Sequence, residues 1–227
     1  MKRHCLNRAV AGIRNYDGCL ADYCVLPVGN LVKIPDSISD DRAVFLEPLS
    51  AACSVLEQIE LRGDEKATVL GDGRIGILCA WVLSTVLSDV SLVGHHPGKF
   101  RSAEWRGLTT AGIPENMIND LVVDATGSGK GISQAMQICR PRGTIVLKST
   151  ITRAENINFS SLVVNEQRII GSRCGRFSDG LRIMEKYPDM PLDRLITDRF
   201  SITQSMKAFE IAAQPDTLKI LIEMADD

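Results

Sequence analysis

A glycine-rich turn between two apolar runs most constrains the fold of this chain. Residues 67–76 read A-T-V-L-G-D-G-R-I-G and continue into an apolar stretch. Gly71 permits a tight turn, Gly73 lets the main chain approach a diphosphate, and Gly76 lets a helix pack closely on its strand. Because a helix start carries unpaired N–H groups and a partial positive charge, the pattern predicts an anion-binding turn between strand and helix. An ordinary glycine turn is the alternative, since the motif recurs by chance in a chain with 18 glycines.

The segments after this turn alternate between helix and strand. The pattern predicts a helix over 75–87, strands over 89–94, 121–127 and 144–148, a helix ending near 139 and a break at 141–143. Such alternation predicts an α/β fold with a doubly wound parallel sheet, the Rossmann arrangement. Ligands bind at the carboxyl ends of the strands in such sheets, where four turns fall: 71–76, 94–97, 126–128 and 148–150.

The bulk composition excludes several classes of partner. The chain has 227 residues, 44% of them hydrophobic, and a formal charge of −2, so it has room for one sizeable core or two unequal ones. Without a basic stripe, nucleic acid is not expected as a partner. No apolar run approaches the roughly 20 residues that span a bilayer, and the first residues lack a secretion signal. We therefore expect a cytoplasmic protein with no membrane partner.

The cysteines form neither a disulfide nor a metal pattern. Their odd number and their spread through predicted core elements predict reduced thiols, with Cys79 and Cys139 as small core residues. No C-x-x-C pair occurs, and the three histidines lie at 4, 95 and 96. Local spacing therefore builds no complete metal site.

The flanking segments complete the chain. Short strands are predicted over 17–28 and 31–36, followed by a helix start at Ser39. After the sheet, the pattern predicts a strand over 168–174, a helix over 177–186, an extended segment over 195–200, a helix over 202–213 and a strand over 218–224.

Taken in order, these motifs resemble the medium-chain, zinc-type alcohol dehydrogenase superfamily, especially its polyol and threonine dehydrogenase-like branches. The matching pieces cover nearly the whole chain: D-G-C-L-A-D-Y at 17–23, L-P at 26–27, N-L-V-K-I-P-D at 30–36, A-V-F-L-E-P-L at 43–49, the glycine turn at 71–76, D-A-T-G-S at 124–128, R-G-T-I-V at 142–146, I-G-S-R-C-G at 170–175, A-F at 208–209 and L-K-I at 218–220. The resemblance implies an NAD(P)-dependent dehydrogenase acting on a small alcohol, polyol or carbonyl compound.

The resemblance also implies a division of the chain. Residues 1–45 are expected to be a remnant of a GroES-like β-barrel catalytic domain, 46–183 the Rossmann domain, and 184–227 the return into the catalytic domain. Similar proteins carry a Cys and a Gly-His-Glu segment for the catalytic zinc before the region matching Asp17, so an N-terminally truncated chain is expected. The remnant before Ala43 is expected to leave strand edges exposed.

Two residues match zinc positions of the family. Cys5 looks like the last of four cysteines that hold a structural zinc, and Glu47 matches an acid at the catalytic zinc. One thiolate and one carboxylate complete neither site, so we expect no bound zinc. A plain helix-start carboxylate is the alternative for Glu47. A catalytically inactive NAD(P)-binding protein, a pseudoenzyme or sensor, is the alternative function, and a methyltransferase or flavoprotein domain is a third.

The end of the second predicted strand bears on the choice of coenzyme. NAD-preferring enzymes place an acid there for the ribose hydroxyls, whereas this chain has Gly94-His95-His96-Pro97. Positive or donor groups from His95, His96 and Lys99 favour NADP over NAD; an exposed histidine pair is the alternative.

Further coenzyme contacts are expected around the predicted sheet edge. By resemblance they come from Arg74, Ile75, Thr126 and Gly127, and from Lys219 near the diphosphate, for which a solvated strand-edge lysine is the alternative. Residues 160–165, S-S-L-V-V-N, match the region through which relatives pair, which predicts a homodimer.

Overall fold

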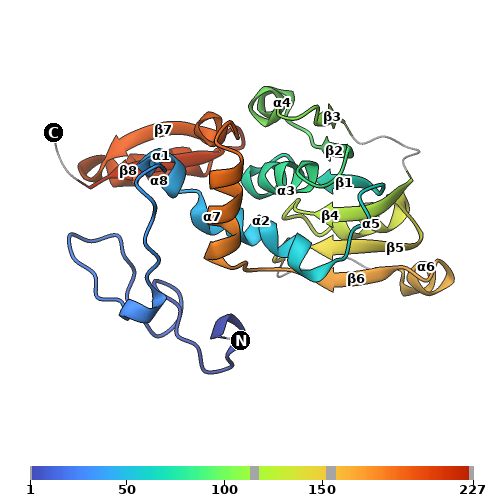
Figure 1. Ribbon diagram of the computed structural model, residues 1–227, viewed down its shortest axis with the longest axis horizontal. Coiled ribbons are helices and arrows are strands. Elements are labelled where there is room, and N and C mark those ends of the chain that lie inside the picture. The colour runs from blue at the N-terminus through green and yellow to red at the C-terminus, as the bar shows by residue number, and fades with distance from the viewer. Residues whose placement is uncertain (1, 113–117, 152–156, 225–227) are drawn as a thin grey trace.

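Six parallel strands form the main sheet of the protein. The computed structural model describes residues 2–112, 118–151 and 157–224 (Figure 1). The strands run in the order β3-β2-β1-β4-β5-β6, and every pairing is parallel. Their bounds are β1 Lys66–Leu70, β2 Asp89–Val93, β3 Thr109–Ala111, β4 Asn119–Asp124, β5 Cys139–Leu147 and β6 Arg168–Gly171. The order reverses beside β1, which confirms the predicted Rossmann sheet.

Helices cover both faces of this sheet, so its strands are apolar on both sides. Val69 and Val123 pack in a larger core with residues of α2, α3 and α7, whereas Leu70 and Val122 pack in a smaller core with residues of α5. Neighbours along a strand thus alternate between the two cores, as the pleat requires. The helices are α2 Leu46–Gln58, α3 Arg74–Ser84, α4 Pro97–Ala103, α5 Gly131–Ile138, α6 Phe159–Val164 and α7 Phe177–Lys186.

Helix α3 is buried on every side. Each residue from Ile77 to Leu83 is inaccessible to solvent, as expected of a helix that is apolar all round. The indole Nε1 of Trp81 donates a hydrogen bond of 2.7 Å to the Ala103 carbonyl, so the one polar atom of this side chain is satisfied. The glycine turn is therefore attached to a helix that is fully buried from Ile77 to Leu83.

The C-terminal part forms a separate parallel pair of strands. Strand β7, Ile196–Ser201, pairs with β8, Lys219–Glu223, and α8, Ser205–Ala212, lies between them in the sequence. Short 3₁₀ turns η3, Leu192–Leu195, and η4, Ile202–Gln204, flank β7. These elements and β6 and α7 confirm the predicted pattern after residue 168. The assignment of β7 and β8 to a barrel domain stays a prediction.

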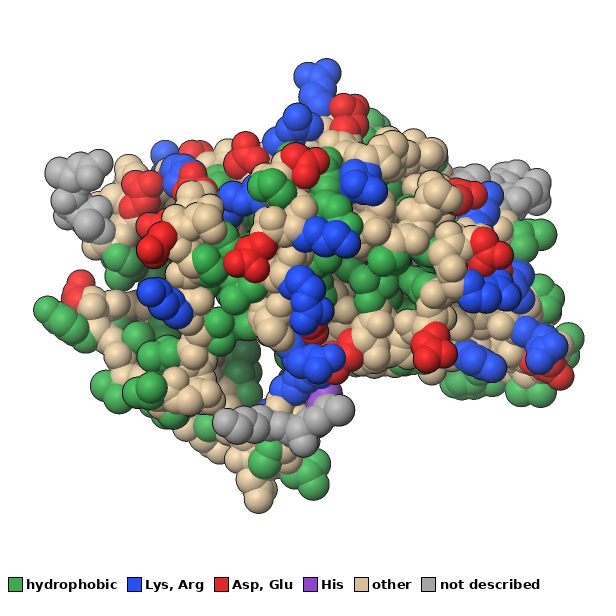
Figure 2. All heavy atoms as spheres, in the orientation of Figure 1, with side chains coloured by type: hydrophobic (Ala, Val, Ile, Leu, Met, Phe, Trp, Pro, Cys, Tyr) green, Lys and Arg blue, Asp and Glu red, His purple; other side chains and the backbone are tan. Residues whose placement is uncertain are grey.

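The strands predicted over 17–28 and 31–36 are wrong. Before α2 the described chain contains only η1 Lys2–His4, η2 Val28–Asn30, α1 Asp40–Ala43 and one bridge between Val10 and Arg14. A strand needs partners to satisfy its main chain, and this segment contacts none. Figure 2 shows hydrophobic side chains gathered on this segment at the lower left. The exposed hydrophobic residues of the segment include Leu6, Ile13, Leu20, Tyr23, Val25 and Val28. The side chains of this region are exposed, but the exposed strand edges expected there are not found in the described residues, because the segment forms no strand.

Three further differences concern the sheet and its helices. The pattern did not predict α4 or β3, because α4 is short and polar and β3 has only three residues. Strand β5 begins at Cys139, so the predicted break at 141–143 lies within the strand, where Arg142 adopts a left-handed φ of 61°. In the described ranges, no helix has both the length and the apolarity to cross a bilayer.

Candidate functional site

The glycine turn connects β1 to α3 through positions where a side chain does not fit. Gly71 has a φ of 108°, and a Cβ there would lie 2.6 Å from the Ala125 carbonyl oxygen. A Cβ on Gly76 would lie 1.8 Å from the carbonyl oxygen of Gly71. Both glycines are therefore required by close packing of the turn against β4 and against itself.

Gly73 has a different role in the same turn. It precedes α3 with extended backbone, and a Cβ built on it meets no atom within 4 Å. The open space beside Gly73 is thus available to a ligand and not needed for packing. Since α3 has 11 residues and no side-chain cap at its start, its first N–H groups and its dipole favour an anion here.

Asp72, between the first two glycines, turns its carboxylate toward the end of β2. Oδ2 accepts a hydrogen bond of 2.6 Å from the His96 main-chain N–H, and the His96 ring Nδ1 lies 3.0 Å from Oδ1. Burial alone would raise the pKa of Asp72, but the His96 hydrogen bonds and the nearby Lys99 charge hold its pKa below the ordinary value. A Cβ on Gly94 would lie within 2.4 Å of this carboxylate, so Gly94 makes room for Asp72.

Asp124 organises the turn after β4. Its Oδ1 accepts hydrogen bonds from the Thr126 N–H at 3.0 Å, the Thr126 hydroxyl at 2.8 Å and the Ser149 hydroxyl at 3.0 Å. The Gly127 N–H donates to the Ser149 Oγ at 2.8 Å. The main-chain donors of Thr126 and Gly127 are thus used within the protein, and their carbonyl oxygens are left for contacts with a ligand. Asp124 thus has a structural role at the end of β4.

A cavity of about 210 Å³ lies where the ends of β1, β2 and β4 meet. Three of the predicted turns contribute to its wall, and the helix start of α5 closes one side. This is the point where the strand order reverses, at which open α/β sheets bind ligands. The lining residues are Leu70, Gly71, Asp72, Val93, Gly94, His95, His96, Thr126, Ser128, Lys130 and Gln134.

Two cations lie beside the start of α3. Arg74 Nη1 donates to the Leu218 carbonyl at 3.2 Å, while the buried Arg74 Nε has no hydrogen-bond partner. Lys219 follows in β8, with its Nζ 5.3 Å from the centre of the Phe45 ring. Burial lowers the pKa of Lys219, the Arg74 charge lowers the pKa further, and Glu47 opposes both. An anion placed between these cations would relieve their repulsion.

A buried lysine at the end of β5 has no counterpart in the sequence predictions. Lys148 Nζ donates to the Ala51 carbonyl at 2.5 Å, the Ser54 hydroxyl at 3.1 Å and the Arg173 carbonyl at 3.1 Å, and lies 3.3 Å from the Ser172 hydroxyl. Burial lowers the pKa of Lys148. The ammonium joins α2, β5 and the end of β6, so its role here is structural.

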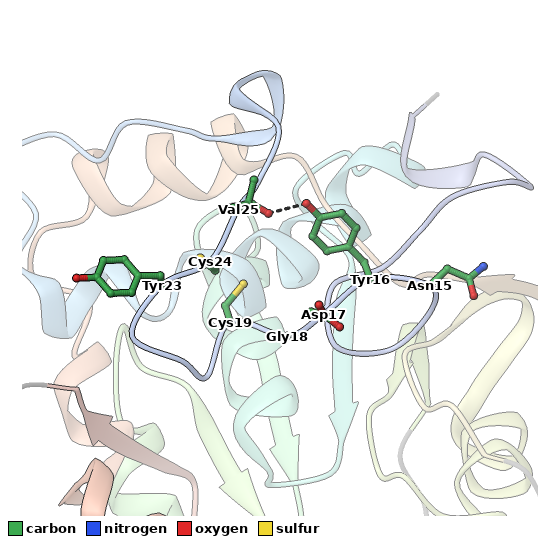
Figure 3. Close-up of a pocket in the computed structure, with 8 residues that line it drawn as sticks. All are labelled: Asn15, Tyr16, Asp17, Gly18, Cys19, Tyr23, Cys24 and Val25. Atoms are coloured by element: carbon green, nitrogen blue, oxygen red, sulfur yellow. Dashed lines mark hydrogen bonds between the residues drawn. The ribbon is translucent and has the colours of Figure 1, made fainter.

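A larger hollow, of about 650 Å³, lies in the N-terminal segment. Figure 3 shows that its wall is one looped stretch, in which the Tyr16 hydroxyl donates to the Val25 carbonyl at 2.5 Å. A hydrogen bond to Cys24 raises the pKa of the Cys19 thiol. No histidine and only one carboxylate, Asp17, line this hollow, so it offers neither an anion site nor a set of metal ligands.

The buried cysteines are inert core residues. Burial raises the pKa of Cys53 to about 12 and the pKa values of Cys79 and Cys139 to about 11. Thiols with such pKa values are protonated at neutral pH, which agrees with the predicted core role of Cys79 and Cys139. All seven cysteines are free.

The structure brings together most of the residues predicted to bind coenzyme. Gly71, Gly94, both histidines and Thr126 line the cavity, and Gly73 and Gly76 continue the same turn into α3. Arg74 and Lys219 lie near each other beside the start of α3. Ile75 packs against the larger core, and Lys99 is buried near Asp72. The sequence interpretation missed Asp72, Ser128, Lys130 and Gln134; the signal for Asp72 was its place between two glycines, opposite a strand that ends in Gly94.

The two predicted zinc residues are not part of a ligand group. Cys5 and Glu47 are both exposed. Across residues 2–112, 118–151 and 157–224, no three His, Cys, Asp or Glu side chains are grouped so that one ion could bind them.

Comparison with known proteins places this arrangement among dehydrogenases. A family model described as the C-terminus of glucose dehydrogenase matches residues 40–224. D-xylulose reductase A of Aspergillus oryzae is 30% identical over 160 residues, which cover 63% of this chain and 45% of that protein. L-threonine 3-dehydrogenase of Escherichia coli is 26% identical over 235 residues, which cover 96% of this chain and 68% of that protein. The match to the reductase thus spans less than half of its length.

Solved structures share the fold at lower identity. A short-chain alcohol dehydrogenase from Escherichia coli, complexed with NADH, superposes with a TM-score of 0.86 at 21% identity, covering 95% of this chain and 68% of that one. A zinc-binding dehydrogenase from Sinorhizobium meliloti, bound to NADP, superposes with a TM-score of 0.85 at 21% identity, covering 97% of this chain and 70% of that one.

Proposed function

Because the chain belongs to the medium-chain, zinc-type alcohol dehydrogenase superfamily, we propose that it is the coenzyme-binding part of an NAD(P)-dependent alcohol or polyol dehydrogenase. The observation that carries the proposal is the turn from Gly71 to Gly76, which is closed to side chains at both ends and open at Gly73. The substrate class follows from relatives named for xylulose and threonine, which suggests a small hydroxylated molecule.

The residues around the turn fit a dinucleotide. Main-chain N–H groups at the start of α3 would hold the diphosphate, with Arg74 and Lys219 placed to neutralise its charge. The cavity at the ends of β1, β2 and β4 would take the adenosine. When bound, the nicotinamide supplies the acceptor for a hydride from the alcohol carbon. The protein's part is to bind and orient it.

For the coenzyme itself we propose NADP over NAD. The end of β2 offers His95 and His96, Lys130 lies on the cavity wall, and Lys99 is buried near Asp72. The one acid there, Asp72, is bonded to His96, so much of its charge is compensated. A 2′-phosphate would meet a net positive surface once a histidine is protonated.

The described residues do not fit a metal ion, and the proposal assigns no metal-dependent step to them. Cys5 as a relic of a structural site and Glu47 as a relic of a catalytic site stay predictions from the resemblance. Glu47 lies close enough to Lys148 and Lys219 to affect both of their pKa values, which suits a carboxylate that balances lysine charge.

We propose that the protein forms a homodimer through the β6 edge of the sheet. Strand β6 is the last strand in the sheet order, and the preceding α6 exposes Phe159, Val163 and Val164. An edge strand flanked by apolar side chains is stabilised by a covering partner. We also propose a cytoplasmic location for the protein. The domain limits 1–45, 46–183 and 184–227 likewise stay proposals.

Titration calorimetry with NADPH, NADH and S-adenosylmethionine tests the proposed function. We expect both nicotinamide coenzymes to bind, NADPH more tightly, and S-adenosylmethionine to give no heat. Gly73→Val should weaken NADPH at least about tenfold, since only the open approach to the diphosphate is blocked.

The matched control is Gly29→Val, which also meets open space but lies in the N-terminal segment. It should bind like the wild type. Absence of binding by both coenzymes, or tight S-adenosylmethionine binding, would overturn the proposal. Coenzyme reduction with a panel of polyols then separates an enzyme from an inactive binding protein.

A further inference from the structure

Asp72 supplies an acid at a place where strand β2 itself has none. Gly94 and His95 follow β2, and the carboxylate reaches this point from the neighbouring glycine turn. The lack of a side chain at Gly94 makes the approach possible, because a Cβ there would overlap the carboxylate. The acid and both histidines thus share the wall of the adenosine cavity.

Two roles are open to such an acid. It could face the ligand, accept hydrogen bonds from ribose hydroxyls and repel a 2′-phosphate, or it could face the protein and orient a neighbour. Asp72 is only 6% exposed, and both of its oxygens lie within 3.1 Å of a His96 nitrogen. The His96 side chain is 37% exposed. The group offered to a ligand is therefore mainly the imidazole.

We propose that Asp72 is a positioning residue for coenzyme choice: it holds His96 through Nδ1, so that the other ring nitrogen is presented to the 2′-phosphate of NADP as part of an imidazolium. This inference rests on the proposed function, and it adds a dependence on pH. A carboxylate beside one ring nitrogen favours the charged ring, and histidine is the side chain that changes charge near neutrality. Preference for a 2′-phosphorylated ligand therefore rises as pH falls from 8 to 6.5.

Other charged groups near the His96 ring also affect the binding of a phosphate. Lys99 of α4 is buried near Asp72, Lys130 lies before α5 on the cavity wall, and His95 is the exposed neighbour. Both lysines add an attraction for phosphate that does not depend on Asp72. Of the two histidines on the cavity wall, His96 is the one that contacts Asp72.

The test compares 2′,5′-ADP with ADP, which differ by the phosphate in question. Their dissociation constants are measured by calorimetry at pH 6.5 and pH 8 for the wild-type chain and for Asp72→Asn, His96→Gln and the double variant. For the wild type we expect the preference for 2′,5′-ADP to be greater at pH 6.5. Asp72→Asn should lose about tenfold of this preference at pH 6.5 with ADP binding retained, as should His96→Gln, and the double variant should lose no more.

The controls separate positioning from a general structural effect. His4→Gln, which changes the histidine outside the cavity wall, should keep the pH profile, and titration of the phosphate itself is common to all variants. A rise in 2′,5′-ADP preference in Asp72→Asn would overturn the inference and make Asp72 a repelling acid, and an unchanged pH profile would also overturn it. Failure of the wild type to bind either nucleotide would instead refute the proposed function.

Discussion

Strand β4 and the segment over 17–28 contain similar apolar and β-branched residues but differ in their neighbours. Val122 in β4 pairs with β1 on one side and β5 on the other and is fully buried. Tyr23 and Val25 are 93% and 81% exposed, and their segment forms no strand. The difference shows that strand propensity needs paired edges and a covered face before it becomes structure. The residues that we propose for coenzyme binding lie at the end of the sheet, where such support exists.

The largest effect on the well-packed region is expected from a substitution at Gly76, which follows the turn between β1 and α3. Gly76→Ala places a Cβ against the Gly71 carbonyl, and neither backbone can move without disturbing α3 or β1. We expect a loss of about 3 kcal/mol or more in the free energy of unfolding, measured by urea denaturation. Gly73→Ala is the matched control, because it meets open space and should change stability by no more than about 1 kcal/mol. Equal stability of the two variants would show that the turn is not closely packed.

Lys148→Met is expected to lower the free energy of unfolding by less than Gly76→Ala does. The change leaves the Ala51 and Arg173 carbonyls without the Lys148 donor, and it removes a buried charge. We expect a loss of about 1–3 kcal/mol in urea denaturation, because unmet polar groups outweigh the relief of desolvation. Lys33→Met, on the exposed N-terminal segment, is the control and should have almost no effect. A more stable Lys148→Met protein would mean that desolvation of the ammonium dominates.

The smallest expected effect is on the stability of the protein in acid, through Asp120 near the amino-terminal ends of β1 and β4. Asp120 accepts from the Lys66 N–H at 2.9 Å and from Arg140 Nε at 2.5 Å, and these contacts hold its pKa below the ordinary value despite burial. A lowered folded-state pKa contributes stability above the unfolded pKa of about 3.9, and this contribution is lost as pH falls through the folded value. Because the pair is partly exposed, we expect Asp120→Asn to cost under about 1 kcal/mol near pH 7.

The measurement is urea denaturation of both proteins from pH 7 down to pH 3. The stability difference between wild type and Asp120→Asn should shrink as pH falls below about 4. Asp64→Asn, an exposed acid beside Arg62, serves as the control. A difference that stays constant or grows toward acid would contradict the role of the Asp120 charge.

Much of the sheet could be predicted, for a physical reason. Runs such as Leu121–Val123 are apolar on both faces because two helical layers cover them, and that pattern is local in the sequence. The glycine turn was equally readable, since Gly71 and Gly76 are demanded by main-chain contacts close to the turn. The role of Asp72 could not be predicted, because it depends on the space left by Gly94, which follows another strand. The role of Lys148 was not predicted because its four oxygen partners come from two segments far from it in the sequence, α2 and residues 172–173.

The hydrogen bond from Arg74 to the Leu218 carbonyl joins residues 144 positions apart, and Lys219 follows immediately. All six strands of the sheet precede Leu218 and Lys219 in the sequence, so they are synthesised first. Domains fold as their residues become available, so the nascent chain has a formed sheet before its cation pair exists. The cation pair that we propose for the diphosphate is therefore completed only near the end of translation.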